Sequence, residues 1–247
     1  MKIIPLSEGA FTIDKTKVFV PFDTAVDDLQ QRPIGSLLVE VQPFCIVTKM
    51  DIIIIDAGLG FSNKQGMLQL HQNLIDNGID PMEVTKVLLS HLHKDHSGGI
   101  SIENKILQQR FISFPNATYY VNKEELASAL DKANASYHRE DFEVLLTADK
   151  VITTTGNGII DDYIRYEVTG GHCPFHQVFW IEEAGQKVFF GGDVAPQLQQ
   201  MKSRFIAKYD FDGRKCMELR ERWWQLGKDE NWTFLFYHDI KSPVYNF

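Results

Sequence analysis

The chain has 247 residues, of which 44% are hydrophobic and 23% are charged, a balance that supports a sizeable core and excludes disorder. We expect a single domain over residues 1–247. The formal net charge is −8, which argues against nucleic acid or an anionic membrane surface as a partner.

Basic side chains gather at only one place in the sequence. Arg214, Lys215, Arg220 and Arg222 alternate there with two glutamates. We interpret this segment as the solvated face of a helix, stabilised by pairs three and four residues apart.

The number of cysteines and the hydropathy of the sequence predict where in the cell the protein resides. Cys45, Cys173 and Cys216 are too few and too scattered for a disulfide framework or a Cys-x-x-Cys zinc site. The N-terminus has no sustained apolar run, and the longest apolar runs elsewhere are strand-sized. We therefore expect a cytoplasmic protein without a membrane span.

The first third of the chain is rich in β-branched and aromatic residues punctuated by Gly, Pro and Asp. The strands predicted there cover residues 11–13, 17–21, 37–41, 44–48 and 52–55. The uniformly apolar run 52–55 predicts a strand buried on both faces. Apolar spacing then predicts a helix over 64–77, with Gly78 as its left-handed cap.

A strand at 86–90 leads into the histidine-rich segment 91–99, and a polar connection follows over 101–116. Asn122 and Glu125 form a predicted capping box for a helix ending near Ala133. The remaining predictions are a strand at 118–121, helices at 139–146 and 217–226, and strands at 163–168, 177–181, 188–190 and 233–237. This order lacks strict strand–helix alternation, so two packed sheets flanked by helices fit better than a doubly wound sheet.

Three of the eight histidines lie within six residues, as His91, His93 and His96, and Asp95 lies among them. Imidazole and carboxylate groups are the usual ligands of zinc and similar metals. In a near-extended loop His91 and His93 project to one side, so Asp95 and His96 can turn to a second ion. Gly98–Gly99 permits the tight backbone that such a loop needs. Because structural zinc favours cysteine shells, this set favours catalysis.

The His-x-His-x-Asp-His loop resembles the signature of the metallo-β-lactamase superfamily, and the resemblance extends over nearly the whole chain. Four further segments resemble motifs of that family: Ile55–Gly58, Thr169–His176, Gly191–Asp193 and Tyr237–Asp239. The resemblance implies an αββα sandwich of two mixed β-sheets flanked by helices, in the α/β class, and a metal-dependent hydrolase.

Carried over position by position, the resemblance implies two metal-binding sets that share one carboxylate. The first set is His91, His93 and His172; the second is Asp95, His96 and His238; Asp193 bridges them. Two divalent ions, zinc first and iron, manganese or cobalt as alternatives, would share a water and present hydroxide to an electrophilic carbon or phosphorus. Asp95 is the expected general acid and base.

Two further residues are expected to support the metal ligands. Asp56 ends an apolar strand, where an unpaired carboxylate is costly, so we expect it to orient a ligand histidine. His176 is a candidate partner for the distal nitrogen of a metal-bound imidazole.

Within the superfamily, the sequence resembles N-acyl homoserine lactonases and phosphotriester (parathion-type) hydrolases most. Only nine residues follow His238, so we do not expect the glutathione-binding extension that glyoxalase II-like members carry. His93 stands where redox di-iron members carry glutamate, and Asp193 where zinc β-lactamases often carry cysteine. The lactonases carry a tyrosine three residues after the bridging aspartate, whereas this chain has Pro196, which weakens the lactonase assignment.

We therefore predict a hydrolase of a small, neutral ester, lactone or phosphotriester, in a protein that could form a homodimer. The alternatives are an N-acyl homoserine lactonase and a non-catalytic metal-binding or sensing module. We interpret Tyr209, Asp210 and Asp212 as a turn with a helix-capping aspartate. Candidate pocket aromatics are Phe22, Phe61, Phe111, Phe114 and Phe205.

Overall fold

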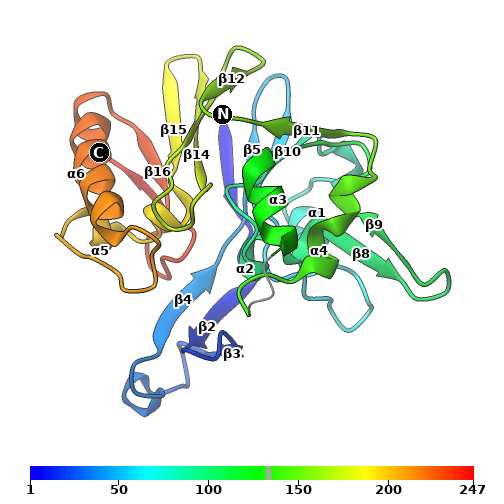
Figure 1. The fold of residues 1–247 in the computed structure, drawn as a ribbon, viewed down its shortest axis with the longest axis horizontal. Coiled ribbons are helices and arrows are strands. Elements are labelled where there is room, and N and C mark those ends of the chain that lie inside the picture. Colours follow the sequence, from blue (N-terminus) through cyan, green and yellow to red (C-terminus); the bar gives the residue numbers. More distant parts are fainter. Residues whose placement is uncertain (132–134) are drawn as a thin grey trace.

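The computed structural model describes residues 1–131 and 135–247, and two six-stranded sheets packed face to face form its centre (Figure 1). In spatial order, the first sheet contains β1 (Lys2–Pro5), β5 (Phe44–Val47), β6 (Ile52–Ile55), β7 (Lys86–Leu88), β10 (Thr118–Asn122) and β11 (Val151–Thr154). The second contains β12 (Gly158–Ile160), β13 (Ile164–Val168), β14 (Gln177–Glu183), β15 (Gln186–Phe190), β16 (Thr233–Leu235) and β17 (Val244–Asn246). Both sheets mix parallel and antiparallel pairs.

Helices cover both outer faces of the sandwich (Figure 1). Their bounds are Gln69–Asp76 (α1), Lys94–Ser97 (α2), Lys123–Asp131 (α3), Arg139–Phe142 (α4), Leu198–Met201 (α5) and Gly213–Asp229 (α6). Short 3-10 helices span Leu29–Gln31, Pro81–Glu83, Gly98–Ile100, Glu143–Leu146 and Gly192–Val194. The αββα sandwich predicted from the sequence is confirmed.

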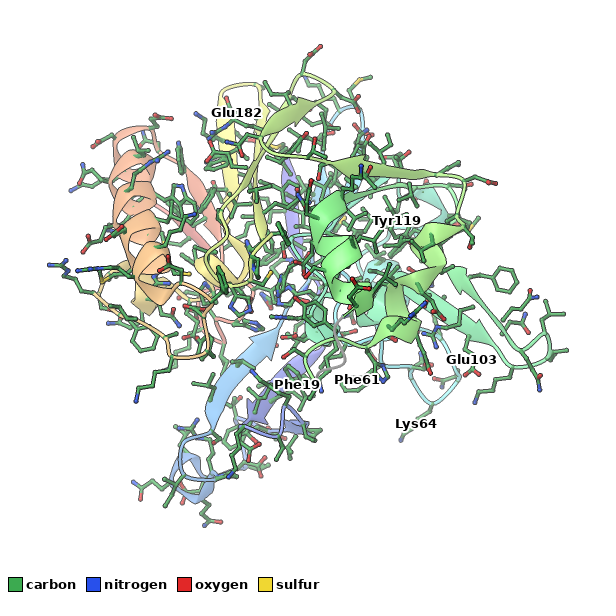
Figure 2. All side chains as sticks on the ribbon, viewed as in Figure 1. Phe19, Phe61, Lys64, Glu103, Tyr119 and Glu182 are labelled. Atoms are coloured by element: carbon green, nitrogen blue, oxygen red, sulfur yellow. The ribbon has the colours of Figure 1, made fainter. Side chains whose placement is uncertain are left out.

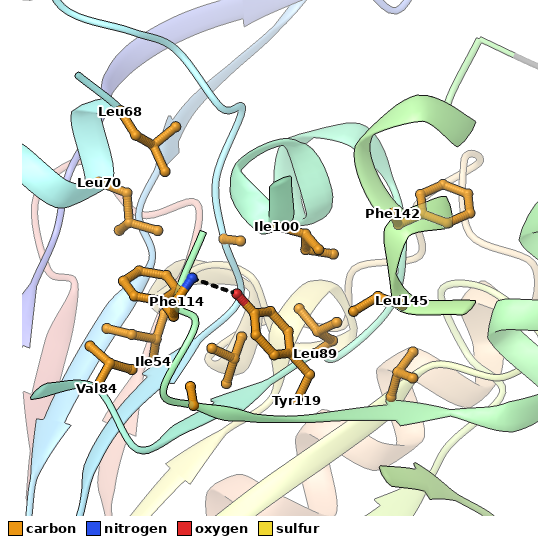
Figure 3. Close-up of a cluster of buried hydrophobic side chains, with 14 of the residues drawn as sticks. Ile54, Leu68, Leu70, Val84, Leu89, Ile100, Phe114, Tyr119, Phe142 and Leu145 are labelled. Carbon is orange, nitrogen blue, oxygen red and sulfur yellow. Dashed lines mark hydrogen bonds between the residues drawn. The ribbon is translucent and has the colours of Figure 1, made fainter. Parts of the chain in front are cut away.

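Three apolar clusters hold these layers together. Phe44, Ile53 and Ile55 of the first sheet meet Phe179 and Phe190 of the second, so the sandwich interior is made from the inner faces of both sheets. The outer face of the first sheet packs against α1, α3 and α4 in a cluster that Figure 3 shows. The outer face of the second sheet packs against α6.

Two smaller sheets extend from the sandwich. The strands β2 (Gly9–Ile13), β3 (Phe19–Pro21) and β4 (Leu37–Val41) form a projecting arm, drawn in blue at the bottom of Figure 1. The strands β8 (Ser101–Asn104) and β9 (Gln109–Ile112) form a hairpin. The predicted polar connection at 101–116 was therefore wrong, because its alternating residues pair across a turn at Asn104, whose side chain accepts from two backbone N–H groups.

Several element boundaries differ from the sequence-based prediction for local reasons. Helix α1 begins at Gln69 rather than at residue 64, because the Asn63 side chain accepts from Gln65 and Met67 N–H and holds a turn. Strand β3 begins after Lys17, whose φ of 60° interrupts an extended strand. The predicted end of α3 near Ala133 lies outside the described residues.

The basic segment of α6 is solvated only in part. Arg214 is exposed and pairs with Glu218, but Arg220 is 1% exposed. Its guanidinium donates to the carbonyl oxygens of Val194, at 2.8 Å, and Phe205. The prediction of a solvated face was wrong for Arg220, because carbonyl groups of the 3-10 helix Gly192–Val194 and of Phe205 replace water around its guanidinium.

Burial describes the three cysteines, and helix length describes the membrane question. Cys45, Cys173 and Cys216 are all buried. None of the helices in the described part of the chain combines the length and apolarity that crossing a bilayer requires.

Candidate metal centre

The predicted metal ligands come from four segments that meet at one edge of the sandwich. The 91–96 loop follows β7 in the first sheet, while the other segments follow β13, β15 and β16 in the second sheet. Strands β15 and β16 are parallel neighbours, so the loops after them lie at the same edge. The structure brings together all seven residues: His91, His93, Asp95, His96, His172, Asp193 and His238.

Close backbone packing fixes the shape of the 91–99 segment. A Cβ atom on Gly98 would lie 2.3 Å from the Leu59 carbonyl, and one on Gly99 would lie 2.2 Å from the Ala57 oxygen. Only glycine at these two positions permits the 57–60 loop to pack this closely against the 91–99 segment.

The first group of ligand atoms surrounds a point between three imidazoles. His93 Nδ1 lies 3.0 Å from His91 Nε2 and 3.0 Å from His172 Nε2. The Oδ2 atom of Asp193 lies 3.3 Å from the same His172 nitrogen. A tetrahedral zinc ion with bonds near 2.0–2.1 Å holds its ligand atoms roughly 3.3 Å apart, so this group has dimensions that suit such an ion.

The second group is organised around the other oxygen of Asp193. Its Oδ1 atom lies 3.1 Å from His96 Nε2 and 3.1 Å from His238 Nε2. Asp95 Oδ2 completes the group at 3.7 Å from His96 and 3.5 Å from His238. One carboxylate of the chain therefore faces both groups, one oxygen to each.

Unsatisfied polar atoms test whether metal ions fit this arrangement. Among the described residues, His96 Nε2 and Asp193 Oδ1 are both buried, and although they lie 3.1 Å apart, neither has a hydrogen-bond partner of suitable geometry. Leaving such atoms unpaired costs about 1–3 kcal/mol each. Because both atoms point into the second group, a cation bound there would satisfy them, and the residues present fit a metal.

Burial and neighbouring charges shift the pKa values of the clustered histidines in opposite directions. Burial and the adjacent imidazoles hold the pKa of His91 and the pKa of His93 well below the ordinary value. Burial also disfavours charge on His96, but Asp193, Asp95 and Asp56 outweigh it and raise the pKa of His96 well above the ordinary value. The first two imidazoles are therefore neutral, as metal ligation requires.

Asp56 orients one histidine of the second group. Its Oδ1 accepts from Ser90 N–H at 2.7 Å, and its Oδ2 lies 2.7 Å from both Ser90 Oγ and His96 Nδ1. These contacts leave Nε2 of His96 directed at Asp193. Asp56 has a φ of 56°, a conformation that favours Gly, Asn and Asp.

His176 contacts the site differently from the expected pairing with a ligand imidazole. Its Nε2 accepts from the backbone N–H of Asp193 at 3.2 Å, and its Nδ1 lies 3.3 Å from Thr169 Oγ1. A Cβ atom on Gly192 would lie 2.6 Å from His176 Nε2, so glycine is needed before Asp193. His176 therefore positions the backbone of the shared carboxylate.

Three partners of the cluster escaped sequence reasoning. Ser90 Oγ lies 3.0 Å from His91 Nδ1, and Asp210 Oδ1 lies 2.9 Å from His172 Nδ1. The carbonyl oxygen of Glu40 accepts from His238 Nδ1 at 2.6 Å. Asp212 caps α6, as predicted, by accepting from Lys215 N–H. Asp210 was assigned to the same turn, but that assignment did not include its contact with His172. No spacing signal distinguishes these two aspartates.

A cavity of about 880 Å³ opens over the cluster. His93, Asp95, His172, Asp193 and His238 form its floor. Its apolar wall includes Phe19, Tyr137, Phe205, Tyr209 and Phe211.

The prediction of pocket aromatics was mostly wrong. Of the five phenylalanines proposed, Phe205 alone lines this cavity in the described ranges. Phe114 is 0% exposed and packs in the core with Leu70 and Ile54 (Figure 3). Phe61 packs on Phe11, at 5.7 Å between ring centroids.

Comparisons with known proteins give the family. N-acyl homoserine lactonase AttM of Agrobacterium fabrum is 33% identical over 123 residues, which cover 44% of this chain and 40% of that relative. The chain thus spans about two fifths of the length of such curated relatives.

Solved structures share the fold over a larger part of the chain. A probable metal-dependent hydrolase from Staphylococcus aureus has a TM-score of 0.79 at 21% identity, covering 99% of this chain and 91% of that one. AidC, a dizinc quorum-quenching lactonase, has a TM-score of 0.72 at 17% identity, covering 98% and 88%. The family model described as the metallo-beta-lactamase superfamily matches residues 40–238. This chain therefore belongs to the metallo-β-lactamase superfamily.

Proposed function

We propose that this chain is a binuclear metal-dependent hydrolase of a small ester, lactone or phosphotriester. The observation that carries the proposal is the carboxylate of Asp193, which presents Oδ2 to His172 at 3.3 Å and Oδ1 to His96 and His238 at 3.1 Å. The residues that face each of its two oxygen atoms would hold one ion each.

Two bound divalent ions, zinc first, would supply Lewis acidity and a water of lowered pKa. The side chain of Asp95 lines the cavity with its Oδ2 directed at the second group, where it can accept a proton and return it to the leaving group. The Tyr237 hydroxyl donates to the Asp95 carbonyl oxygen at 2.6 Å and fixes the loop that carries this carboxylate.

The cavity supports a small-molecule substrate. Its floor carries the polar cluster, and its wall includes aromatic and aliphatic side chains, which can bind an apolar group of a substrate while a polar bond lies over the cluster. An N-acyl homoserine lactone is the second candidate, and the similarity to AttM favours it. Against this candidate, Pro196 lines the cavity at the position where the resembling lactonases carry a tyrosine.

Reconstitution tests the proposal. The chain is stripped with a chelator, loaded with zinc, manganese or cobalt, and assayed by pH-stat on phenyl acetate, N-hexanoyl homoserine lactone and paraoxon. We expect turnover of at least one class that disappears on chelation and returns with metal. Two ions per chain without turnover of any of the three would overturn the proposal and favour a metal-binding or sensing module.

A further inference from the structure

Positive side chains gather around the cavity although the chain as a whole is acidic. The formal net charge is −8, yet the cavity is lined by as many lysines as aspartates. The lysines are Lys15, Lys17, Lys94 and Lys208; the aspartates are Asp14, Asp95, Asp193 and Asp210.

The aspartates have partners within the protein. Asp14 accepts from Thr16 N–H at 2.8 Å, Asp210 binds His172, and Asp95 and Asp193 belong to the metal cluster. The lysines have none of this kind: over residues 1–131 and 135–247, no carboxylate oxygen lies within 4.0 Å of their ammonium groups. The positive charge on this wall is therefore available to a ligand.

Lys94 belongs to the segment that carries the metal ligands, and Lys17 belongs to the arm, which contacts that segment through Phe19. Lys94 directly follows His93, and its Nζ lies 5.8 Å from the centroid of the Phe19 ring. Phe19 begins β3, at the place where the arm meets the body of the molecule (Figure 2). Both lysines are partly buried. The arm thus brings Lys17 to the loop of the metal ligands.

Lys17 and Lys94 line the same cavity. The Lys94 ammonium group lies 5.8 Å from the ring centroid of Phe19, which follows Lys17 by two residues in the arm. Like charges held together beside a low-dielectric aromatic wall repel one another, and an anion between them relieves that repulsion. Bound divalent metals would make the same wall more positive.

The backbone of the arm is shaped to present Lys17. Its φ is 60°, and its N–H donates to the Asp14 carbonyl oxygen at 3.0 Å. A long side chain in this left-handed conformation costs energy that an asparagine or glycine would avoid. The turn nevertheless carries lysine at this position, where the side chain lines the cavity.

We infer that Lys17 and Lys94 form a subsite for an anionic group, a carboxylate or a phosphate, carried by the substrate beside its scissile bond. This inference rests on the proposed hydrolase function and replaces the neutral substrate expected from the sequence. Lysine ammonium groups bind a carboxylate or a phosphate as point charges. Substrates that carry each of these two anions are therefore compared in the experiment.

Two matched pairs of substrates test the subsite with the zinc-loaded chain at low ionic strength. The carboxylate pair is the γ-lactone of 2-hydroxyglutarate and its carboxamide; the phosphate pair is 1-acetylglycerol 3-phosphate and 1-acetylglycerol. In at least one pair we expect the anionic member to have the higher kcat/KM. In the Lys17→Met/Lys94→Met variant that anionic-to-neutral ratio should fall by about tenfold, and added salt should reduce it in the unaltered chain.

Control variants separate charge from shape. Lys17→Arg/Lys94→Arg should keep the ratio within about threefold, and Lys228→Met, an exposed lysine on α6, should leave it unaltered. An equal loss on both members of each pair, or no preference for either anionic member, overturns the subsite while leaving the hydrolase proposal intact.

A binding measurement keeps the two proposals distinguishable. If no member of either pair is hydrolysed, the proposed function fails for these substrates, and the metal-free chain is titrated calorimetrically with the same compounds. Tighter binding of an anionic member than its neutral partner, lost in the double Lys→Met variant, supports the subsite. Equal binding of both members overturns it.

Discussion

His96 Nδ1 lies 2.7 Å from Asp56 Oδ2, and neither side chain is exposed to solvent. The pair fixes the ring so that Nε2 faces Asp193. Tyr237 stacks on the same ring, with 4.0 Å between centroids. The direction of Nε2 of His96, a predicted metal ligand, is therefore set by a residue 40 positions away in the sequence.

Replacing Asp56 by asparagine tests this control. Asparagine tolerates the left-handed backbone of Asp56, so Asp56→Asn removes the charge while preserving the turn. We expect zinc affinity to fall about 10–100-fold in competition with a chromophoric chelator. Asp161→Asn is the matched control, because Asp161 has a φ of 48° and pairs with Lys86 away from the cluster. Equal zinc affinity of Asp56→Asn and the unaltered chain would disprove the orienting role.

Asp95→Asn separates proton transfer from metal binding. The amide keeps an oxygen that can face the second group but no longer accepts a proton at neutral pH. We expect the variant to retain most of its metal by elemental analysis, while kcat falls by about 100–10,000-fold. Undiminished kcat at full metal content would contradict the proton role of Asp95.

Asp210→Asn should affect the first group alone, because Asp210 contacts His172 Nδ1 at 2.9 Å. We expect the affinity of one of the two ions to fall about 10–100-fold, which cobalt titration would record as a biphasic binding curve. Asp212→Asn, two residues further on, alters the cap of α6 without touching the cluster. A uniform loss at both sites, or the same curve for both variants, would rule out this selective effect.

Glu8 should make stability depend on pH. Burial raises the pKa of Glu8 from its ordinary value of 4.5 to about 7, although its Oε2 accepts from Leu59 N–H at 2.6 Å. Between these two values the folded state binds more protons than the unfolded state. The contribution of Glu8 to the free energy of unfolding therefore falls as pH rises through this window.

Glu8→Gln stays neutral throughout and retains an oxygen acceptor for Leu59. Relative to the unaltered chain, we expect similar stability near pH 4.5 and a gain of roughly 2 kcal/mol at pH 8, from urea unfolding of metal-free protein. A difference between the two proteins that is the same at both pH values would show that Glu8 does not titrate in this window.

The sequence alone determined the features that depend on neighbours along the chain. The 91–96 spacing predicted that imidazole and carboxylate groups gather in one place, as they do. The apolar run of β6 predicted a buried strand, as Ile53–Ile55 show at 0% exposure. Strand β4 was predicted with its observed bounds because β-branched residues and the punctuating residues beside them act over a few positions.

The tertiary structure decided which distant groups meet. Asp210 and Asp212 look alike in sequence, but packing turns only Asp210 toward His172. Arg220 resembles its exposed neighbours, yet the loops over α6 bury it. Lys17 reaches the cavity because the arm folds against the 91–96 loop. Hydrogen bonds and charges act through space, so their partners are fixed only when the sheets and loops have packed.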